Sequence, residues 1–386
     1  MRKCIVTNFA YGTGPYLRTT DLAVAVNDEL ERRGHMRLGI IVPWVYGEKQ
    51  KRVMWEEFAG HEKKYPGEIM LDAELGALLR SVFYGDATYE QALLKWTDSY
   101  VFISDAAHQH LSGECEVETL FGEKRRASGK DIIMELSRSP RIRYDVAPAY
   151  FTTFAYIAEI LEHSRGVKEI DVSFDLLEKG IKAANWVEGN QRIRVIAWPA
   201  TFAYLGELPL RHEGEILVPP LAPLPRPNDD IIDPGVFVTI TGIPGLERLY
   251  ADAKRLGLKL YSNDTDAVSG SVHALPHIIP NKNVAFQFAR AGWSSIWISM
   301  ISGTPLVVPD FDAKDDPEIY FNNRSVEELG LGVVFRGQSL EDILKEVPRI
   351  KESYKKIREK IIARWGTLDG NRYCAKLFAD DFLSNR

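Results

Sequence analysis

Apolar residues near the start of the chain follow a strand–helix–strand order. The run over residues 3–9 is rich in Ile and Val and predicts a buried strand. Apolar side chains then recur every four residues over 20–33, which predicts an amphipathic helix with Thr19 or Thr20 as its N-terminal cap. Residues 38–42 predict the next strand. Such short connections between strand, helix and strand are typical of a parallel sheet.

The same alternation restarts in the C-terminal half. Residues 236–241 predict a strand, 246–256 a helix, 258–261 a second strand and 306–308 a later, short buried strand. A second unit of this kind indicates a second α/β domain. We therefore expect an α/β protein with two Rossmann-like domains that face each other across a cleft.

A proline-rich segment separates the two patterns. Five of the eleven residues in 217–227 are proline, which has no amide hydrogen and a fixed φ, so this stretch cannot continue a helix or a central strand. We read it as a semi-rigid linker. The expected domains are residues 1–225 and residues 226–365, with a C-terminal helix over 366–386 placed to pack back on the first domain.

The middle of the chain is less regular. Residues 101–104 predict a strand, 150–163 an amphipathic helix and 192–197 another strand. Asp105 and His108 would then follow a strand end, where an imidazole oriented by a carboxylate can act as a general base. The alternative is that both are ordinary polar loop residues.

Composition narrows the class of protein. The chain has 386 residues with 48 Lys plus Arg against 54 Asp plus Glu, a net charge of -6, which argues against non-specific nucleic-acid binding. Its three cysteines are far apart and show no CxxC spacing, so neither a disulfide framework nor a zinc site is indicated and a reducing cytoplasmic setting is expected. A locally basic segment over 124–143 suggests an anionic acceptor or a membrane surface, although a solvated face is the commoner role.

Three glycine-containing segments are candidates for phosphate binding at helix N-termini. They are Gly12-Thr13-Gly14, a loop from Gly242 to Gly245, and the segment from Arg290 to Ser295. In the third, Gly292 lets a ligand approach the backbone, Ser294 and Ser295 offer hydroxyls, and Arg290 supplies a permanent charge. Each glycine loop taken alone could equally be a plain turn.

The third segment also carries a resemblance to a known family. Arg290-Ala-Gly-Trp-Ser-Ser, Ser302-Gly-Thr-Pro305 and the stretch from Glu318 to Asn322 resemble the donor-binding half of GT-B glycosyltransferases. They are similar to the antibiotic and plant UDP-glycosyltransferases and to the lipid-II GlcNAc transferase. The resemblance implies that the arginine–glycine segment binds the donor diphosphate and that Glu318 and Asn322 bind the donor sugar, with Asp316 as a competing carboxylate.

Two departures from the family pattern affect these assignments. Many members have a catalytic histidine just after the N-terminal glycine loop, and this chain has Arg18-Thr19-Thr20 there. Ile319 stands where the family usually has Gln. The general base is therefore sought elsewhere in the N-terminal domain, first at the Asp105–His108 pair and next at Asp21.

The resemblance implies an activity. The expected reaction moves a sugar from a nucleoside-diphosphate sugar, with UDP favoured, to a hydroxyl of a small-molecule, glycan or lipid-linked acceptor, without a metal ion or other cofactor. Two alternatives stay open: a nucleotide-sugar epimerase of the same fold, and an inactive subunit that only binds nucleotide sugar. The expected location is the cytoplasm or, through residues 124–143, a membrane surface.

Overall fold

The computed structural model divides the chain into two compact units. Unit 1 comprises Met1–Ala197, Leu210–Val218 and Asn371–Arg386, and unit 2 comprises Trp198–Pro209 and Pro219–Gly370. The structure describes residues 2–10, 12–82, 88–206, 210–239 and 246–385. The chain therefore changes unit after residues 197, 209, 218 and 370. The sequence led us to expect one crossing near residue 225 and a return of the C-terminal helix over 366–386 to the first domain.

Unit 1 is built on a nine-stranded sheet with the order β5-β4-β3-β2-β1-β6-β7-β8-β9. The strands β3, β4 and β5 pair antiparallel, and the other neighbouring pairs are parallel. The strands are β1 Cys4–Phe9, β2 Gly39–Pro43, β3 Ile69–Asp72, β4 Glu114–Thr119, β5 Lys124–Ser128, β6 Ile132–Arg138, β7 Ala149–Thr153, β8 Ile193–Ala197 and β9 Ile216–Val218. Because β1 is central and the strand order reverses beside it, the topological switch point lies between β1 and β6.

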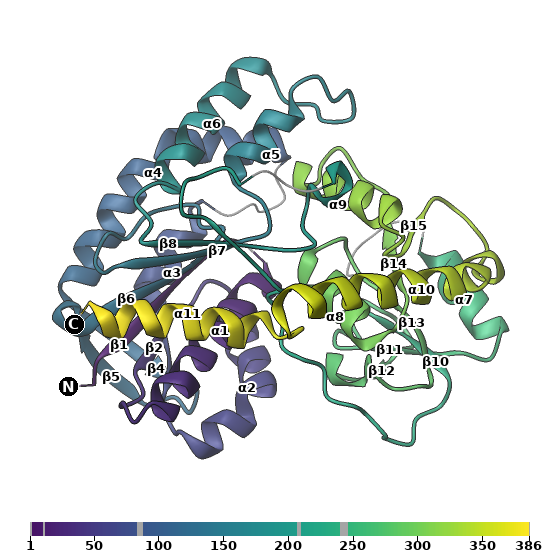
Figure 1. Ribbon diagram of the computed structural model, residues 1–386, viewed down its shortest axis with the longest axis horizontal. Helices are drawn as coiled ribbons and strands as arrows, with labels where there is room; N and C mark the ends of the chain where they lie inside the picture. Colours follow the sequence, from purple (N-terminus) through teal and green to yellow (C-terminus); the bar gives the residue numbers. More distant parts are fainter. Residues whose placement is uncertain (1, 11, 83–87, 207–209, 240–245, 386) are drawn as a thin grey trace. The chain divides into compact units, whose positions relative to one another are not determined.

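Helices cover both faces of this sheet (Figure 1). The helices α1 and α11 are joined by an ion pair between Arg33 and Asp380, and α11 is tied to β7 by the Tyr150 hydroxyl, which donates to Asp381 at 2.7 Å. The helices with residues in unit 1 are α1 Thr13–Arg32, α2 Gly47–Lys64, α3 Ala73–Arg80, α4 Tyr89–Ser112, α5 Ile157–Ser164, α6 Phe174–Val187 and α11 Gly370–Ser384.

The helix α1 begins seven residues earlier than its apolar pattern predicts, at Thr13. Gly14 and Pro15 lie in its first turn, where proline is tolerated because the first N–H groups of a helix have no acceptor within it. Thr19 and Thr20 are not N-terminal caps. Their hydroxyls instead donate to the carbonyls of the residues four positions earlier, at 2.7 and 2.8 Å.

Two expectations about the middle of the chain are wrong. Residues 101–104 lie inside α4, whose N-terminus has a capping box made by Thr88 and Gln91. The β-branched and aromatic run reads as a strand, but Ile103, Ala107 and Leu111 are buried along one helix face, and this packing decides the structure. Residues 150–153 belong to β7, so the helix expected over 150–163 is present only from residue 157, as α5, while the strand expected over 192–197 is confirmed as β8.

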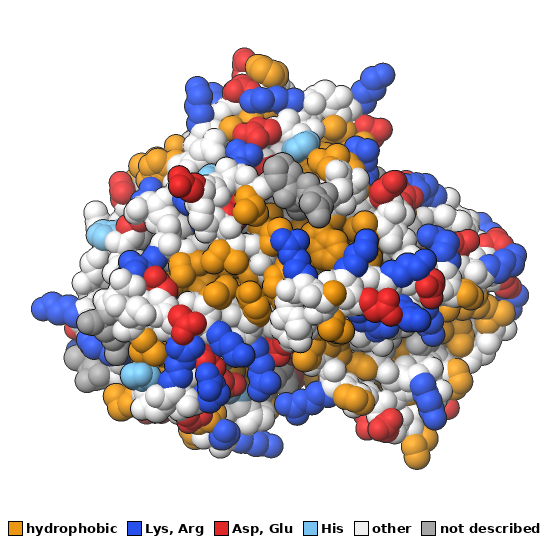
Figure 2. Space-filling view, in the orientation of Figure 1, with side chains coloured by type: hydrophobic (Ala, Val, Ile, Leu, Met, Phe, Trp, Pro, Cys, Tyr) orange, Lys and Arg blue, Asp and Glu red, His pale blue; other side chains and the backbone are white. Residues whose placement is uncertain are grey.

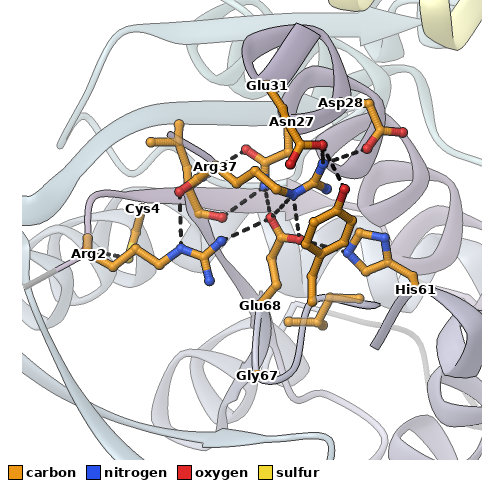
Figure 3. A network of polar contacts seen from close by, with 12 residues as sticks. Arg2, Cys4, Asn27, Asp28, Glu31, Arg37, His61, Gly67 and Glu68 are labelled. Carbon is orange, nitrogen blue, oxygen red and sulfur yellow. Dashed lines mark hydrogen bonds and ion pairs between the residues drawn. The ribbon is translucent and has the colours of Figure 1, made fainter. Parts of the chain in front are cut away.

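A buried carboxylate anchors the amino ends of three strands in unit 1. Glu68 is fully buried just before β3, and its Oε1 accepts hydrogen bonds from Arg2 at 3.3 Å and from Asn27 (Figure 3). Its Oε2 accepts from Arg37 at 3.0 Å and contacts His61 at 2.8 Å. Several donors are needed because one isolated buried carboxylate would be strongly destabilising. The network lies at the edge opposite the carboxyl ends, where ligands bind in parallel sheets, so we assign it to stability.

Unit 2 contains a six-stranded, fully parallel sheet with the order β12-β11-β10-β13-β14-β15. This is the doubly wound order, with a switch point between β10 and β13. The strands are β10 Gly235–Val238, β11 Lys259–Ser262, β12 Val272–His273, β13 Val284–Phe288, β14 Leu306–Pro309 and β15 Val333–Phe335. The helices are α7 Glu247–Arg255, α8 Trp293–Ser302, α9 Pro317–Glu328 and α10 Leu340–Trp365. The expected order of elements after residue 235 is confirmed.

Candidate functional site

The strongest candidate site lies at the switch point of unit 2. The strands β10 and β13 run side by side, and the chain leaving β13 enters α8 through Ala289–Gly292. Ligands of open parallel sheets bind beyond the carboxyl ends of the strands at such a point. Arg290, Gly292, Ser294 and Ser295, which the sequence singled out, are therefore brought to the place that the topology favours.

Gly292 is the N-terminal cap residue of α8, and no side chain caps that end. Its backbone angles, φ −83° and ψ 137°, are open to any residue, and a Cβ built there would meet no atom of the described residues beyond its chain neighbours within 4 Å. Within the described part of the fold, nothing therefore requires a glycine at this position. The open space beside the first N–H groups of the helix suits an anionic ligand that approaches the backbone closely.

Arg290 supplies positive charge at the same helix end. Its side chain is half exposed and forms an ion pair with Asp315, from the loop after β14. A guanidinium has five N–H donors, so one carboxylate leaves further donors for a second anion. Ser294 and Ser295, in the first turn of α8, are half-buried.

Asn322 is fully buried in α9 and connects the parts of this site. Its amide nitrogen donates to the Ala291 carbonyl at 2.7 Å and to Glu318 Oε1 at 2.8 Å, and its amide oxygen accepts from Trp293 Nε1 at 2.7 Å. The indole N–H also reaches Thr201 Oγ1 at 3.1 Å. Asn322 therefore positions the carboxylate and the glycine segment, and the structure does not favour the direct sugar contact that the resemblance implied for it.

The two competing carboxylates differ in environment. Asp316 is the N-terminal cap of α9, and its Oδ1 accepts from the Glu318 amide at 2.9 Å. Glu318 lies in the first turn and is half-buried. Because Asp316 is committed to the helix end, Glu318 is the better candidate for hydrogen bonds to a sugar.

The N-terminal glycine loop lies at the switch point of unit 1. Gly12 has a φ of +104°, a value that L side chains rarely adopt, and its amide donates to the Tyr46 hydroxyl at 2.5 Å. Thr13 and Gly14 form the first turn of α1. The segment from Gly242 to Gly245 lies outside the described residues.

Asp105 and His108 do not follow a strand, so the premise of the base assignment is wrong. Both are exposed on α4, and His108 Nδ1 contacts the Tyr144 carbonyl at 2.8 Å. A carbonyl only accepts, so this nitrogen carries the proton and Nε2 is the basic atom. The catalytic role of the pair stays a prediction, without the strand-end position that motivated it.

A polar cluster at the unit 1 switch point has more of the features expected of an acceptor-side group. Arg18 donates to Asp21 at 2.5 Å on α1, and both side chains are largely buried. Burial raises the pKa of Asp21 above its usual value. The positive charges of Arg18 and of Arg138, the last residue of β6, oppose this rise but do not cancel it. The sequence could not show this cluster because Arg138 is 117 positions from Asp21.

The basic segment over 124–143 offers little unpaired charge to a membrane. Lys124 pairs with Glu116, and Arg143 pairs with Asp145, each at 2.8 Å. Arg138 and Arg141 are buried.

Side chains of both charge signs appear together over the face seen in Figure 2, in keeping with the mildly acidic chain. Among the described helices, none is long and apolar enough to cross a membrane. Membrane contact through this segment stays a prediction.

Comparison with known proteins connects this geometry to one class. Neither a family model nor a curated protein matches the chain by sequence. Solved structures do match by fold: CalG4, the calicheamicin glycosyltransferase, has a TM-score of 0.56 and 15% identity, and covers 99% of this chain and 98% of its own. Medicago truncatula UGT71G1, complexed with UDP-glucose, has a TM-score of 0.56, 14% identity and the same coverage. TcCGT1, in complex with UDP, has a TM-score of 0.64, 11% identity and complete coverage of both chains.

The fold is therefore that of GT-B glycosyltransferases over the whole length of the chain. The resemblance stated from the sequence is confirmed at the level of fold. At identities of 15% or less, these matches show the architecture and leave the reaction to be argued from the site.

Proposed function

We propose that this protein transfers a sugar from a nucleoside-diphosphate sugar, with UDP as the nucleotide, to a hydroxyl group of an acceptor. One observation carries the proposal. An uncapped helix N-terminus, Arg290 and the held carboxylate of Glu318 meet at the switch point of a doubly wound sheet. The fold neighbours that were solved with UDP or UDP-glucose support a donor of that class.

In this proposal the donor diphosphate lies against the N-terminus of α8. The helix dipole, the backbone N–H groups near Gly292 and the guanidinium of Arg290 offset the negative charge that builds up on the leaving diphosphate. The diphosphate binds the guanidinium N–H donors that the pair with Asp315 leaves available. Glu318 accepts hydrogen bonds from sugar hydroxyls. Because a helix terminus and an arginine can supply this stabilisation, we propose that turnover needs no divalent metal ion.

We further propose that unit 1 activates the acceptor. Asp21 replaces the Asp105–His108 pair as the favoured base because it lies beside the switch point, and burial raises its pKa toward the working range of a general base. Arg18 fixes the direction of its carboxylate. The acceptor is a hydroxyl-bearing small molecule, glycan or lipid-linked compound.

The test begins with thermal unfolding in the presence of UDP, ADP and GDP and of several UDP-sugars. A ligand that binds only the native state raises the melting temperature, and UDP compounds are expected to raise it most. Product analysis then follows, with and without acceptor alcohols and with EDTA. A sugar transferred only when acceptor is present supports the proposal, whereas a changed sugar without acceptor would indicate an epimerase. If no nucleotide raises the melting temperature, the proposal fails.

A further inference from the structure

Outside the donor and acceptor sites, unit 1 contains a group of metal-type donor atoms. Asp72, His110 and Cys115 place a carboxylate oxygen, an imidazole nitrogen and a sulfur within 4.8 Å of one another. Asp72 is the last residue of β3, His110 lies in the last turn of α4 and Cys115 is in β4. Among the residues that the structure describes, no other three such side chains lie close enough together to hold an ion.

The three side chains are shielded from solvent. Asp72 is 0% and Cys115 1% exposed, and the His110 side chain is 7% exposed. His110 Nε2 lies 2.8 Å from Asp72 Oδ2, and Cys115 Sγ lies 3.4 Å from the His110 carbonyl oxygen. Glu74, in the first turn of α3, brings Oε2 to 3.4 Å from His110 Nδ1. Asp72 Oδ1 accepts from the Leu75 amide, which fixes this carboxylate in place.

These donors match zinc better than other common ions. Zinc binds thiolate, imidazole and carboxylate in tetrahedral sites, with bonds of about 2.0–2.3 Å, so its ligand atoms lie within roughly 4 Å of one another. Magnesium and calcium prefer oxygen ligands alone, and a thiolate disfavours both. The three donor atoms, which all lie within 4.8 Å of one another, are close to this spacing.

The surroundings of the imidazole also fit. A histidine that binds zinc through one ring nitrogen usually donates its other N–H to a carboxylate, which fixes the ring. In this protein Asp72 faces one ring nitrogen and Glu74 faces the other. With Asp72 as a ligand, Nε2 would bind the ion, and Nδ1 would then donate to Glu74, whose Oε2 lies 3.4 Å away.

We propose that Asp72, His110 and Cys115 form a structural zinc site. The ion would join the end of α4 and the start of β4, which follow one another in the sequence, to the carboxyl end of β3, 38 positions before His110. The site belongs to unit 1, whereas the residues proposed for donor binding belong to unit 2, and the inference does not depend on the proposed glycosyl transfer. The amino-acid sequence alone does not indicate this site, because its cysteine spacing is not that of a zinc motif.

The test uses the full chain, stripped with a chelator and titrated with Zn²⁺ against a chromophoric competitor. One zinc ion per chain is expected, together with a rise in melting temperature. Bound Co²⁺ should show the charge-transfer absorption of a thiolate ligand. Cys115→Ser should abolish that absorption, and Cys115→Ser and His110→Ala should each weaken Zn²⁺ binding by at least the roughly 10- to 100-fold that loss of an outer-shell partner costs.

Cys4→Ser is the matched control, since Cys4 is also buried in a strand of the same sheet but lies outside the group. It should keep both the absorption and the affinity. Far-UV circular dichroism of the metal-free variants checks that each is folded. The proposal is overturned if the wild-type chain binds no stoichiometric Zn²⁺, or if Cys115→Ser and His110→Ala bind it as the wild type does. Asp72 and His110 would then form only a hydrogen-bonded pair. No nucleotide enters these measurements, so their failure leaves the proposed transfer untouched.

Discussion

Asn322 and Glu318 lie one helical turn apart on α9, and the amide of the first donates to the carboxylate of the second at 2.8 Å. Asn322 has no exposed surface, while Glu318 is half-buried. The same amide also holds the Ala291 carbonyl, next to the N-terminus of α8. One buried side chain thus couples the proposed sugar-binding carboxylate to the proposed diphosphate-binding segment.

Replacing this amide should separate sugar recognition from diphosphate binding. We expect Asn322→Ala to lower the free energy of unfolding by about 1–3 kcal/mol because it leaves buried groups such as the Ala291 carbonyl without their partner. We also expect it to weaken UDP-sugar binding more than UDP binding, since Glu318 would lose its orientation. Calorimetric titration with UDP and with a UDP-sugar measures the ratio of the two dissociation constants.

Asn323→Ala is the matched control for this change. Asn323 is buried in the same helix, but its amide donates to the Pro309 carbonyl at 3.0 Å. This variant should lose stability and keep the wild-type ratio of affinities. Equal weakening of UDP and UDP-sugar binding in Asn322→Ala would count against a role for Glu318 at the sugar.

Gly292 should tolerate a side chain structurally but not functionally. Its φ of −83° and the open space at its Cβ position predict that Gly292→Ala keeps or slightly raises the melting temperature. A methyl group at the helix N-terminus should nevertheless obstruct a diphosphate, and we expect at least a tenfold loss of UDP affinity, about 1.4 kcal/mol. Gly303→Ala, at the other end of α8 with a φ of +79°, should instead destabilise the protein and leave UDP affinity unchanged. Unimpaired UDP binding by Gly292→Ala would place the diphosphate elsewhere.

The two ends of α8 also show what the sequence could supply. Gly303 ends the helix in the left-handed conformation, and the segment around Gly292 was identified from the sequence because residue type and spacing are local properties. The positioning role of Asn322 was not accessible, because it depends on contacts with Trp293 and Ala291, 29 and 31 positions away. The Glu68 network could not be predicted from the sequence either, because its partners come from segments up to 66 positions apart. The error over residues 101–104 had another cause, since strand-forming residue types were overridden by the packing of one helix face.

Arg290 should contribute to nucleotide binding rather than to stability. Its pair with Asp315 is at the surface, where ion pairs are worth about 0–1 kcal/mol, so Arg290→Ala should change the melting temperature little. Loss of a charged hydrogen-bonding partner should weaken UDP binding by roughly 1.5–3 kcal/mol. Arg336→Ala, which removes a comparable pairing with Glu327 and Asp310, serves as the control. If Arg290→Ala binds UDP as tightly as the wild type, the arginine does not hold the diphosphate.

The buried carboxyl of Glu135 predicts a specific pH dependence of stability. Burial raises its pKa from 4.5 to about 7, although Asn8 and Ser137 donate hydrogen bonds to it. Between pH 4.5 and 7 the folded protein therefore binds a proton that the unfolded chain has lost, and stability falls as the pH rises through this window. Glu135→Gln removes the proton exchange and keeps an acceptor oxygen. Its advantage over the wild type should grow from pH 5 and level off above pH 7, on the order of 3 kcal/mol.

Glu29→Gln supplies a control of opposite sign. Hydrogen bonds from Arg32 and Arg33 lower the pKa of Glu29 to about 2, so its contribution is present above pH 4.5 and is lost as the pH falls toward 2. This variant should be less stable than the wild type at pH 7, with the difference shrinking in acid. Urea unfolding at several pH values measures both variants. A pH-independent difference for Glu135→Gln would show that this carboxyl titrates normally.

The last prediction concerns the group that activates the acceptor. Asp21 lies on α1 beside the unit 1 switch point, paired with Arg18 and near Arg138 at the end of β6. Asp21→Asn keeps the size of the side chain and an acceptor for Arg18 but removes the basic carboxylate. We therefore expect kcat to fall roughly 10²- to 10⁴-fold, the usual contribution of a general base, while UDP affinity stays at the wild-type value. His108→Gln and Asp105→Asn, on the exposed side of α4, should keep kcat within about twofold if Asp21 is the base. Steady-state kinetics of the three variants, with UDP affinity measured for each, separates the assignments. If His108→Gln alone loses turnover, the base is instead the imidazole of the Asp105–His108 pair. The Tyr144 carbonyl holds the proton of this imidazole on Nδ1, so its Nε2 is free of a proton and can act as the base.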